Sequence, residues 1–146
     1  TARLDGYRMC FPSKSFVRDC ATISVEPTMG ECVWGALYEV DEVGMKRLDD
    51  REGCDVTSAD KTRNRHNRVT VQVVASDDRP VVAETYIAVP TEKPGQPSPQ
   101  YIAYLVASAA ECGLPKSHLV KLAQHVTSAQ QITANPLQIA AQQQAA

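Results

Sequence analysis

The chain has 146 residues, of which 43% are hydrophobic, so it suits one domain with one core and is too short for two well-formed domains. Its net charge of −2 gives no general attraction to nucleic acid or to anionic membranes, and no apolar run approaches the roughly 20 residues that cross a bilayer. Its five cysteines include no C-x-x-C pair, which argues against a disulfide framework and a structural zinc site. We therefore expect a soluble, cytoplasmic protein with reduced thiols that binds neither nucleic acid nor membrane.

Predicted strands dominate the first half of the chain. Residues 7–11 and 20–25 are short candidates, which we expect to end at Pro12 and at the turn segment 27–30. Residues 33–40 are predicted to form a buried strand.

A helix is predicted after residue 40, because Asp41 can cap its first turn and Gly53 suits the left-handed residue that ends it. Glu52 then lies at the C-terminal end of this helix, where the partial negative charge of the helix disfavours an ionised carboxylate. Such an acid exchanges protons more readily near neutral pH, which makes Glu52 a candidate general base. The alternative is a frayed helix end with solvated acids.

The second half of the chain predicts a hairpin followed by two helices. Residues 69–75 alternate apolar and polar side chains, and residues 81–89 can pair with them. Helices are expected over residues 99–111, after the N-cap Ser98, and over residues 116–126. Antiparallel strands followed by separate helices indicate an α+β fold, with a small β-barrel as one form of it.

The domain is expected to cover residues 1–126, and residues 127–146 are expected to be a flexible tail rich in glutamine and alanine.

Five short motifs in this order resemble the γ-glutamylcyclotransferase family, also called AIG2-like. The resemblance covers residues 2–125 and is specific because the motifs occur together at approximately the family's spacing. The motifs are Ala21-Thr22-Ile23, Val33-Trp34-Gly35-Ala36-Leu37-Tyr38, Leu48-Asp49-Asp50-Arg51-Glu52-Gly53, Pro97-Ser98-Pro99-Gln100-Tyr101 and Gly113-Leu114-Pro115.

The resemblance implies a small mixed or antiparallel β-barrel with packed helices, and an enzyme that cyclises a γ-glutamyl amide to 5-oxoproline with release of an amine. This chemistry uses no metal and no organic cofactor. The family's acid/base glutamate falls on Glu52, and its substrate-contacting tyrosine falls on Tyr101. The implied partner is a small γ-glutamyl substrate.

The sequence also departs from the family. The family's Tyr-Gly-Ser-Asn loop, which holds the γ-glutamyl group, has no counterpart here and is expected upstream of Thr1, so an N-terminal segment or a second protomer could complete the barrel. Asp19 and Cys20 replace the paired glycines that commonly precede the first motif, and the segment 54–68 is enlarged and lacks the usual tyrosine. The alternative function is therefore a catalytically lapsed relative that binds a ligand or a protein.

Other clusters point less clearly to chemistry. The segment 61–68 holds four basic residues and a histidine, which could grip phosphate but is more typical of a solvated insertion loop. Cys112 and His118 could form a thiol and its base, although a buried cysteine beside a surface histidine is the commoner case. His118 and His125 share a helix face without further metal ligands, which disfavours zinc binding.

Overall fold

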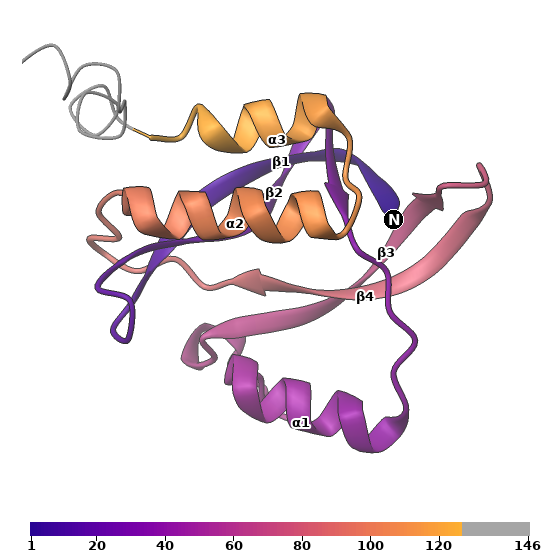
Figure 1. Cartoon of the computed structure of the whole chain (residues 1–146). Helices are drawn as coiled ribbons and strands as arrows, with labels where there is room; N and C mark the ends of the chain where they lie inside the picture. Colours follow the sequence, from indigo (N-terminus) through magenta and orange to yellow (C-terminus); the bar gives the residue numbers. More distant parts are fainter. Residues whose placement is uncertain (127–146) are drawn as a thin grey trace, which may run out of the picture.

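Two β-hairpins build the sheet of this protein, and three helices flank it (Figure 1). The structure, a computed structural model, describes residues 1–126. All strand pairs are antiparallel, in the order β2-β1-β3-β4. The strands are β1 (Ala2–Ser15), β2 (Cys20–Gly35), β3 (His66–Ala75) and β4 (Pro80–Ala88).

The two hairpins touch along only a short stretch. β1 pairs with β3 at Ala2 with Ala75 and at Arg3 with Val74, after which the two strands diverge. The sheet of the described residues is therefore open, and the predicted α+β class is confirmed.

The predicted strand breaks at Pro12 and at residues 27–30 are wrong, because the first hairpin continues through both prolines. Pro12 lies within the register shift between Cys10 and Ser13, where a missing N–H costs no ladder hydrogen bond. Pro27 lies on β2, which is an edge strand. An edge strand tolerates proline because a backbone nitrogen on its outer side has no neighbouring strand to bond.

The predicted buried strand over residues 33–40 is also wrong beyond its first three residues. Gly35 pairs with Ala2 at the end of the β1–β2 ladder, and residues 36–41 leave the sheet. Tyr38 is exposed there, so the apolar run was misleading because burial depends on a partner strand.

The predicted helices are confirmed in type and approximate extent. In α1 (Glu42–Glu52), the Asp41 carboxylate accepts a hydrogen bond from the Gly44 N–H at 2.7 Å. Ser98 caps α2 (Pro99–Glu111) in the same way, and α3 (Lys116–Ala123) follows. A short 3₁₀ helix, Lys61–Arg63, precedes β3.

The helices lie on two sides of the strands. Figure 1 shows α2 and α3 next to each other, overlapping β1 and β2 in this view, and α1 below β3 and β4. Ile102 of α2 is the most buried large side chain, at 2% exposure, whereas α1 has no buried residue. α1 must therefore be held by contacts other than a buried apolar stripe.

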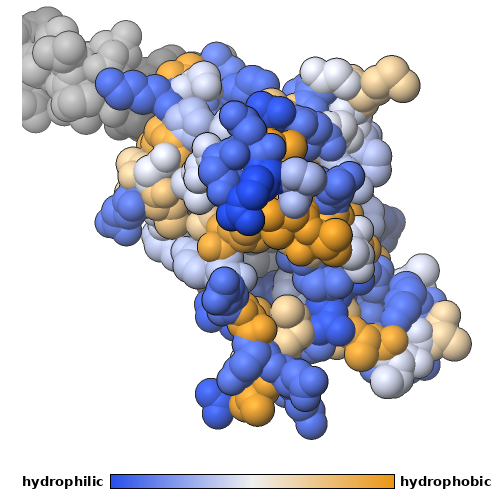
Figure 2. All heavy atoms as spheres, turned by 90° about the vertical axis from the view of Figure 1, so that its right-hand side faces the viewer, coloured by the Kyte–Doolittle hydropathy of each residue, from blue (hydrophilic) through white to orange (hydrophobic). Residues whose placement is uncertain are grey.

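A small apolar cluster joins the two hairpins where β1 and β3 meet. Its buried members are Ala2, Leu4, Val71 and Val73. Figure 2 shows apolar side chains gathered in a band between polar regions on one face of the molecule.

No helix among the described residues is long and apolar enough to cross a membrane. The tail predicted over residues 127–146 lies outside the described residues.

Candidate active site

A cavity of about 700 Å³ lies where the end of α1, the start of α2 and the tip of the β1–β2 hairpin meet. Glu52 and Tyr101, the two residues singled out in the sequence, both line it. The fold thus brings together two side chains that are far apart in the chain. Between them, the wall is completed by residues 13–18, by Thr22 and Ile23, and by residues 89–91.

The turn after α1 sets the position of Glu52. Gly53 adopts φ 63° and ψ 44°, the left-handed conformation that glycine tolerates best. The Cys54 N–H donates to the Asp49 carbonyl at 2.8 Å, and the Arg65 N–H donates to the Gly53 carbonyl at 3.0 Å. The helix end is therefore hydrogen-bonded to the chain that enters β3.

Basic side chains cover the carbonyl groups at this helix end. Arg65 Nη2 donates to the Arg51 carbonyl at 2.6 Å, and His66 Nδ1 lies 3.0 Å from the Glu52 carbonyl oxygen. The same Nδ1 lies 3.5 Å from Glu52 Oε2. These groups offset the partial negative charge of the helix terminus, which the sequence argument had treated as uncompensated.

The Glu52 side chain remains accessible to solvent. It is 32% exposed and His66 is 23% exposed, so both reach the cavity while staying in contact with each other. A carboxylate in this setting can accept a proton from a ligand and return it without moving far.

Tyr101 lies on the first turn of α2, is buried, and is one of the residues that line the cavity. The hydroxyl oxygen accepts a hydrogen bond from the Ile23 N–H at 3.1 Å, which leaves its own hydrogen available to a ligand. Burial raises the pKa of Tyr101, so the phenol stays protonated and can donate at neutral pH.

The tip of the first hairpin is attached to α2 by an arginine. The Arg18 guanidinium lies 5.1 Å from the ring centres of both Tyr101 and Tyr104. Such cation–π contacts favour one orientation of the hairpin tip. Phe16 and Val17, beside Arg18, line the cavity and are almost fully exposed.

The cavity wall carries more basic than acidic side chains. Its basic side chains are Lys14, Arg18, Arg51 and Arg65, and its one carboxylate is Glu52. A wall of this composition favours an anionic ligand over a cationic one.

A polar cluster holds α1 against the sheet. Arg68 Nη1 of β3 donates to Asp49 Oδ2 at 2.9 Å, and the Tyr86 hydroxyl of β4 donates to Asp49 Oδ1 at 2.7 Å. Burial and the Asp49 carboxylate raise the pKa of Tyr86 to about 12. Asp49 is only 13% exposed. Because α1 has no buried residue, these two hydrogen bonds hold it to the sheet in place of a buried apolar stripe.

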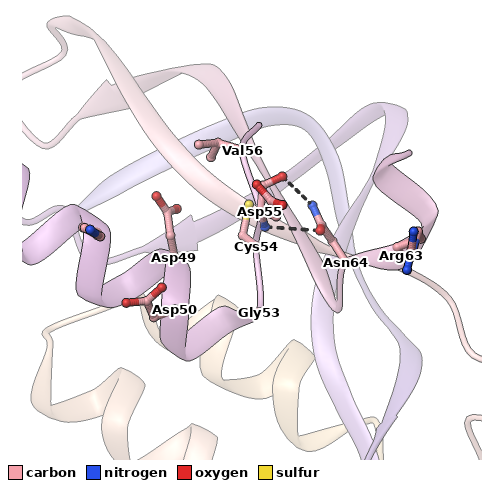
Figure 3. Close-up of a pocket in the computed structure, with 9 residues that line it drawn as sticks. Asp49, Asp50, Gly53, Cys54, Asp55, Val56, Arg63 and Asn64 are labelled. Atoms are coloured by element: carbon pink, nitrogen blue, oxygen red, sulfur yellow. Dashed lines mark hydrogen bonds between the residues drawn. The ribbon is translucent and has the colours of Figure 1, made fainter. Parts of the chain in front are cut away.

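A second cavity of about 520 Å³ lies on the other side of the Gly53 turn (Figure 3). Figure 3 shows the Asn64 amide bonded to both backbone groups of Asp55: the Asp55 N–H donates to Asn64 Oδ1 at 3.2 Å, and Asn64 Nδ2 donates to the Asp55 carbonyl at 3.2 Å. Asn64 is buried, and these bonds close the segment 54–64 into a defined loop.

The basic segment 61–68 is not the solvated loop expected from the sequence. It begins as the 3₁₀ helix and ends within β3, and Arg65 and Arg68 are both hydrogen-bonded to α1. Sequence reasoning missed His66 for this reason, since neither its spacing from Glu52 nor its neighbours signals a contact.

The expected environments of Cys112 and His118 are reversed. Cys112 is exposed and lies 3.8 Å from the Tyr38 hydroxyl, whereas His118 is 4% exposed. His118 is one of the buried residues of α3, the helix that packs against α2. Among residues 1–126, no three histidine, cysteine or acidic side chains are grouped so that they could hold a metal ion.

Comparisons with known proteins agree with this architecture. The model of the AIG2-like family matches residues 32–122. A human protein named γ-glutamylcyclotransferase is 26% identical over 127 residues, which is 83% of this chain and 62% of the human protein. The chain thus spans less than two thirds of that relative.

Two solved structures share the fold. One is named γ-glutamyl cyclotransferase and superposes with a TM-score of 0.71, and the other is human uncharacterized protein loc79017, with a TM-score of 0.70. Each is 22% identical, covering 83% of this chain and 69% of the solved one. From the extent of the family match, the chain belongs to the AIG2-like family, which includes the γ-glutamylcyclotransferases.

Proposed function

We propose that this chain carries the acid/base site of a γ-glutamylcyclotransferase-like enzyme, which cyclises a γ-glutamyl amide to 5-oxoproline and releases an amine. The observation that carries the proposal is that Glu52 and Tyr101 line one cavity of about 700 Å³. Family membership and the name of the human relative support the same reaction.

Glu52 is the general base and then the general acid. Its carboxylate takes a proton from the α-ammonium group of the substrate, and the freed nitrogen attacks the γ-carbonyl carbon. Glu52 then returns the proton to the amide nitrogen as the original C–N bond breaks. The attacking nitrogen loses its second proton to the departing amine, so the products are 5-oxoproline and an ammonium ion, and Glu52 carries the first proton in both directions.

Tyr101 binds and orients the substrate. Its hydroxyl is held by the Ile23 N–H and can donate to a carboxylate or carbonyl oxygen of the ligand. The basic residues of the wall favour the negatively charged carboxylate of the γ-glutamyl group. Holding the substrate with its nitrogen near the γ-carbonyl carbon supplies much of the acceleration in an intramolecular reaction.

The test is 5-oxoproline release from γ-glutamyl-alanine by wild type, Glu52→Gln and the control Glu42→Gln. Glu42 lies in the first turn of the same helix, is exposed and does not line the cavity. We expect Glu52→Gln to lose about 10²–10⁴ in rate, because the amide cannot relay a proton, and Glu42→Gln to keep wild-type activity. Half of the wild-type turnover in Glu52→Gln would remove Glu52 from the reaction.

A further inference from the structure

His66, the first residue of β3, lies beside Glu52 in the cavity wall. Its Nδ1 atom is 3.0 Å from the Glu52 carbonyl oxygen and 3.5 Å from Glu52 Oε2. We propose that His66 is a positioning residue: its hydrogen bond to the Glu52 carbonyl oxygen fixes the backbone of Glu52, and so the place from which the carboxylate reaches the substrate. This inference rests on the proposed function of Glu52.

The contact defines which ring nitrogen carries hydrogen. A backbone carbonyl can only accept a hydrogen bond, so Nδ1 must be the donor to the Glu52 carbonyl. In the neutral ring Nε2 then carries the lone pair, and no hydrogen bond to Nε2 occurs within residues 1–126. The donor side of His66 is therefore turned towards Glu52.

The backbone around His66 fixes the ring. The preceding residue, Arg65, donates its N–H to Gly53 and accepts from the Val89 N–H at 2.9 Å, while His66 pairs with Ala88 in the β3–β4 ladder. These bonds hold the start of β3 between the end of α1 and β4. The backbone of His66 is therefore held in place, which lets its ring keep a fixed position beside Glu52.

The surrounding charges come from three elements. Arg51 belongs to α1, Arg65 precedes β3, and Lys14 and Arg18 come from the first hairpin region. These cations line the same cavity as Glu52, so a carboxylate free to change rotamer has more than one positive charge towards which it can turn. The hydrogen bond from His66 Nδ1 to the Glu52 carbonyl restricts the backbone of Glu52 and thereby the range of positions open to its carboxylate.

Two variants separate the hydrogen bond from the bulk of the ring. His66→Leu removes the donor, whereas His66→Asn can place an amide N–H close to the Nδ1 position. Arg63→Gln is the control, because Arg63 is an exposed member of the same segment that lines the second cavity.

We expect His66→Leu to lower kcat about five- to tenfold, the effect of losing one hydrogen bond, with KM changed less than about twofold. His66→Asn should retain at least about half of the wild-type kcat, and Arg63→Gln should match wild type. Equal kcat values for wild type and His66→Leu would overturn the inference while leaving the role of Glu52 intact.

A nitrogen NMR spectrum of the wild-type histidine side chains provides a second readout that needs no turnover. The inference requires a protonated Nδ1 on neutral His66, and a ring protonated on Nε2 instead would overturn it even in an active enzyme. Absence of 5-oxoproline release in wild type, with Nδ1 protonated, would overturn the proposed function and retain the contact. The two failures are therefore distinguishable.

Discussion

The hydroxyl of Tyr101 is hydrogen-bonded within the fold, and we propose that it also binds the substrate in the cavity. It accepts from the Ile23 N–H, and its hydrogen can meet a ligand. We expect Tyr101→Phe to lower the free energy of unfolding by about 0.5–1.5 kcal/mol and to raise KM by about two- to tenfold. Urea unfolding and steady-state kinetics with γ-glutamyl-alanine check the two effects.

Tyr104→Phe is the matched control for this prediction. Tyr104 is 55% exposed and meets Arg18 through its ring, which the substitution keeps. Lower stability in Tyr101→Phe without a change in KM would assign Tyr101 to packing alone.

Asp19 adopts φ 49° at the turn of the first hairpin, a left-handed conformation that glycine tolerates best. Its exposed ion pair with Lys14 adds little to stability. We expect Asp19→Gly to melt at or above the wild-type temperature and Asp19→Ala to melt below it, because alanine tolerates the left-handed region worst of the three. Equal melting of the two variants below wild type would show that the ion pair, which both of them lack, governs this turn rather than the backbone.

The sequence singled out cavity residues that belong to a family motif. It did not single out residues that reach the cavity only through long-range pairing in the fold. The family segments led to Glu52 and Tyr101, and both line the same cavity. His66 escaped notice because its contact with Glu52 is created by the pairing of β3 with β4 and by the backbone bond between Arg65 and Gly53. No local pattern encodes such a contact.

Asp49 links the middle of α1 to both β3 and β4. Asp49 accepts from Arg68 and Tyr86, and the helix buries no apolar residue. We expect Asp49→Ala to destabilise the protein by about 2–3 kcal/mol and to reduce turnover as well, because Glu52 lies on the same helix.

Asp50→Ala is the control on this helix, since Asp50 is the exposed neighbour of Asp49. Thermal unfolding and 5-oxoproline release should be measured on both variants. Equal stability of the two would show that α1 is held by other contacts.

Helices were easier to predict than strands for a physical reason. Asp41, Gly53 and Ser98 satisfy helix ends through their own side chains or backbone, so the signals are local. The length of β1 and β2 depends on a partner strand and on register shifts that absorb Pro12, which the local sequence does not reveal. The β3–β4 hairpin was predicted because its alternation and turn are both local.

At the scale of the whole molecule, two histidines make stability depend on pH. Burial lowers the pKa of His118 and His125 below the ordinary value of 6.5. The unfolded chain therefore binds protons at a higher pH than the folded chain, and stability is complete above about pH 6.5 and falls as the pH decreases through the folded pKa values.

Urea unfolding at about pH 7.5 and pH 5.5 measures this effect. His118→Asn should show a smaller loss between the two pH values than wild type, because its side chain does not titrate. An equal loss in both proteins would mean that His118 is not responsible for the pH dependence.

The overall class followed from the order of strands and helices, and family membership followed from the motifs. The open junction between β1 and β3 could not be predicted from the sequence, because the two long hairpins meet through only two residue pairs. Completion of the barrel by another segment or protomer stays a prediction.

The central claim is that the cavity between α1, α2 and the first hairpin is the substrate site. The most direct measurement is an amide NMR titration of Glu52→Gln with γ-glutamyl-alanine, since this variant should bind the substrate without converting it. We predict shifts concentrated at Thr22, Ile23, Thr91 and Tyr101, which line that cavity. Shifts confined to Asp55 and Val56 in the second cavity, or no shifts at saturating substrate, would contradict the claim.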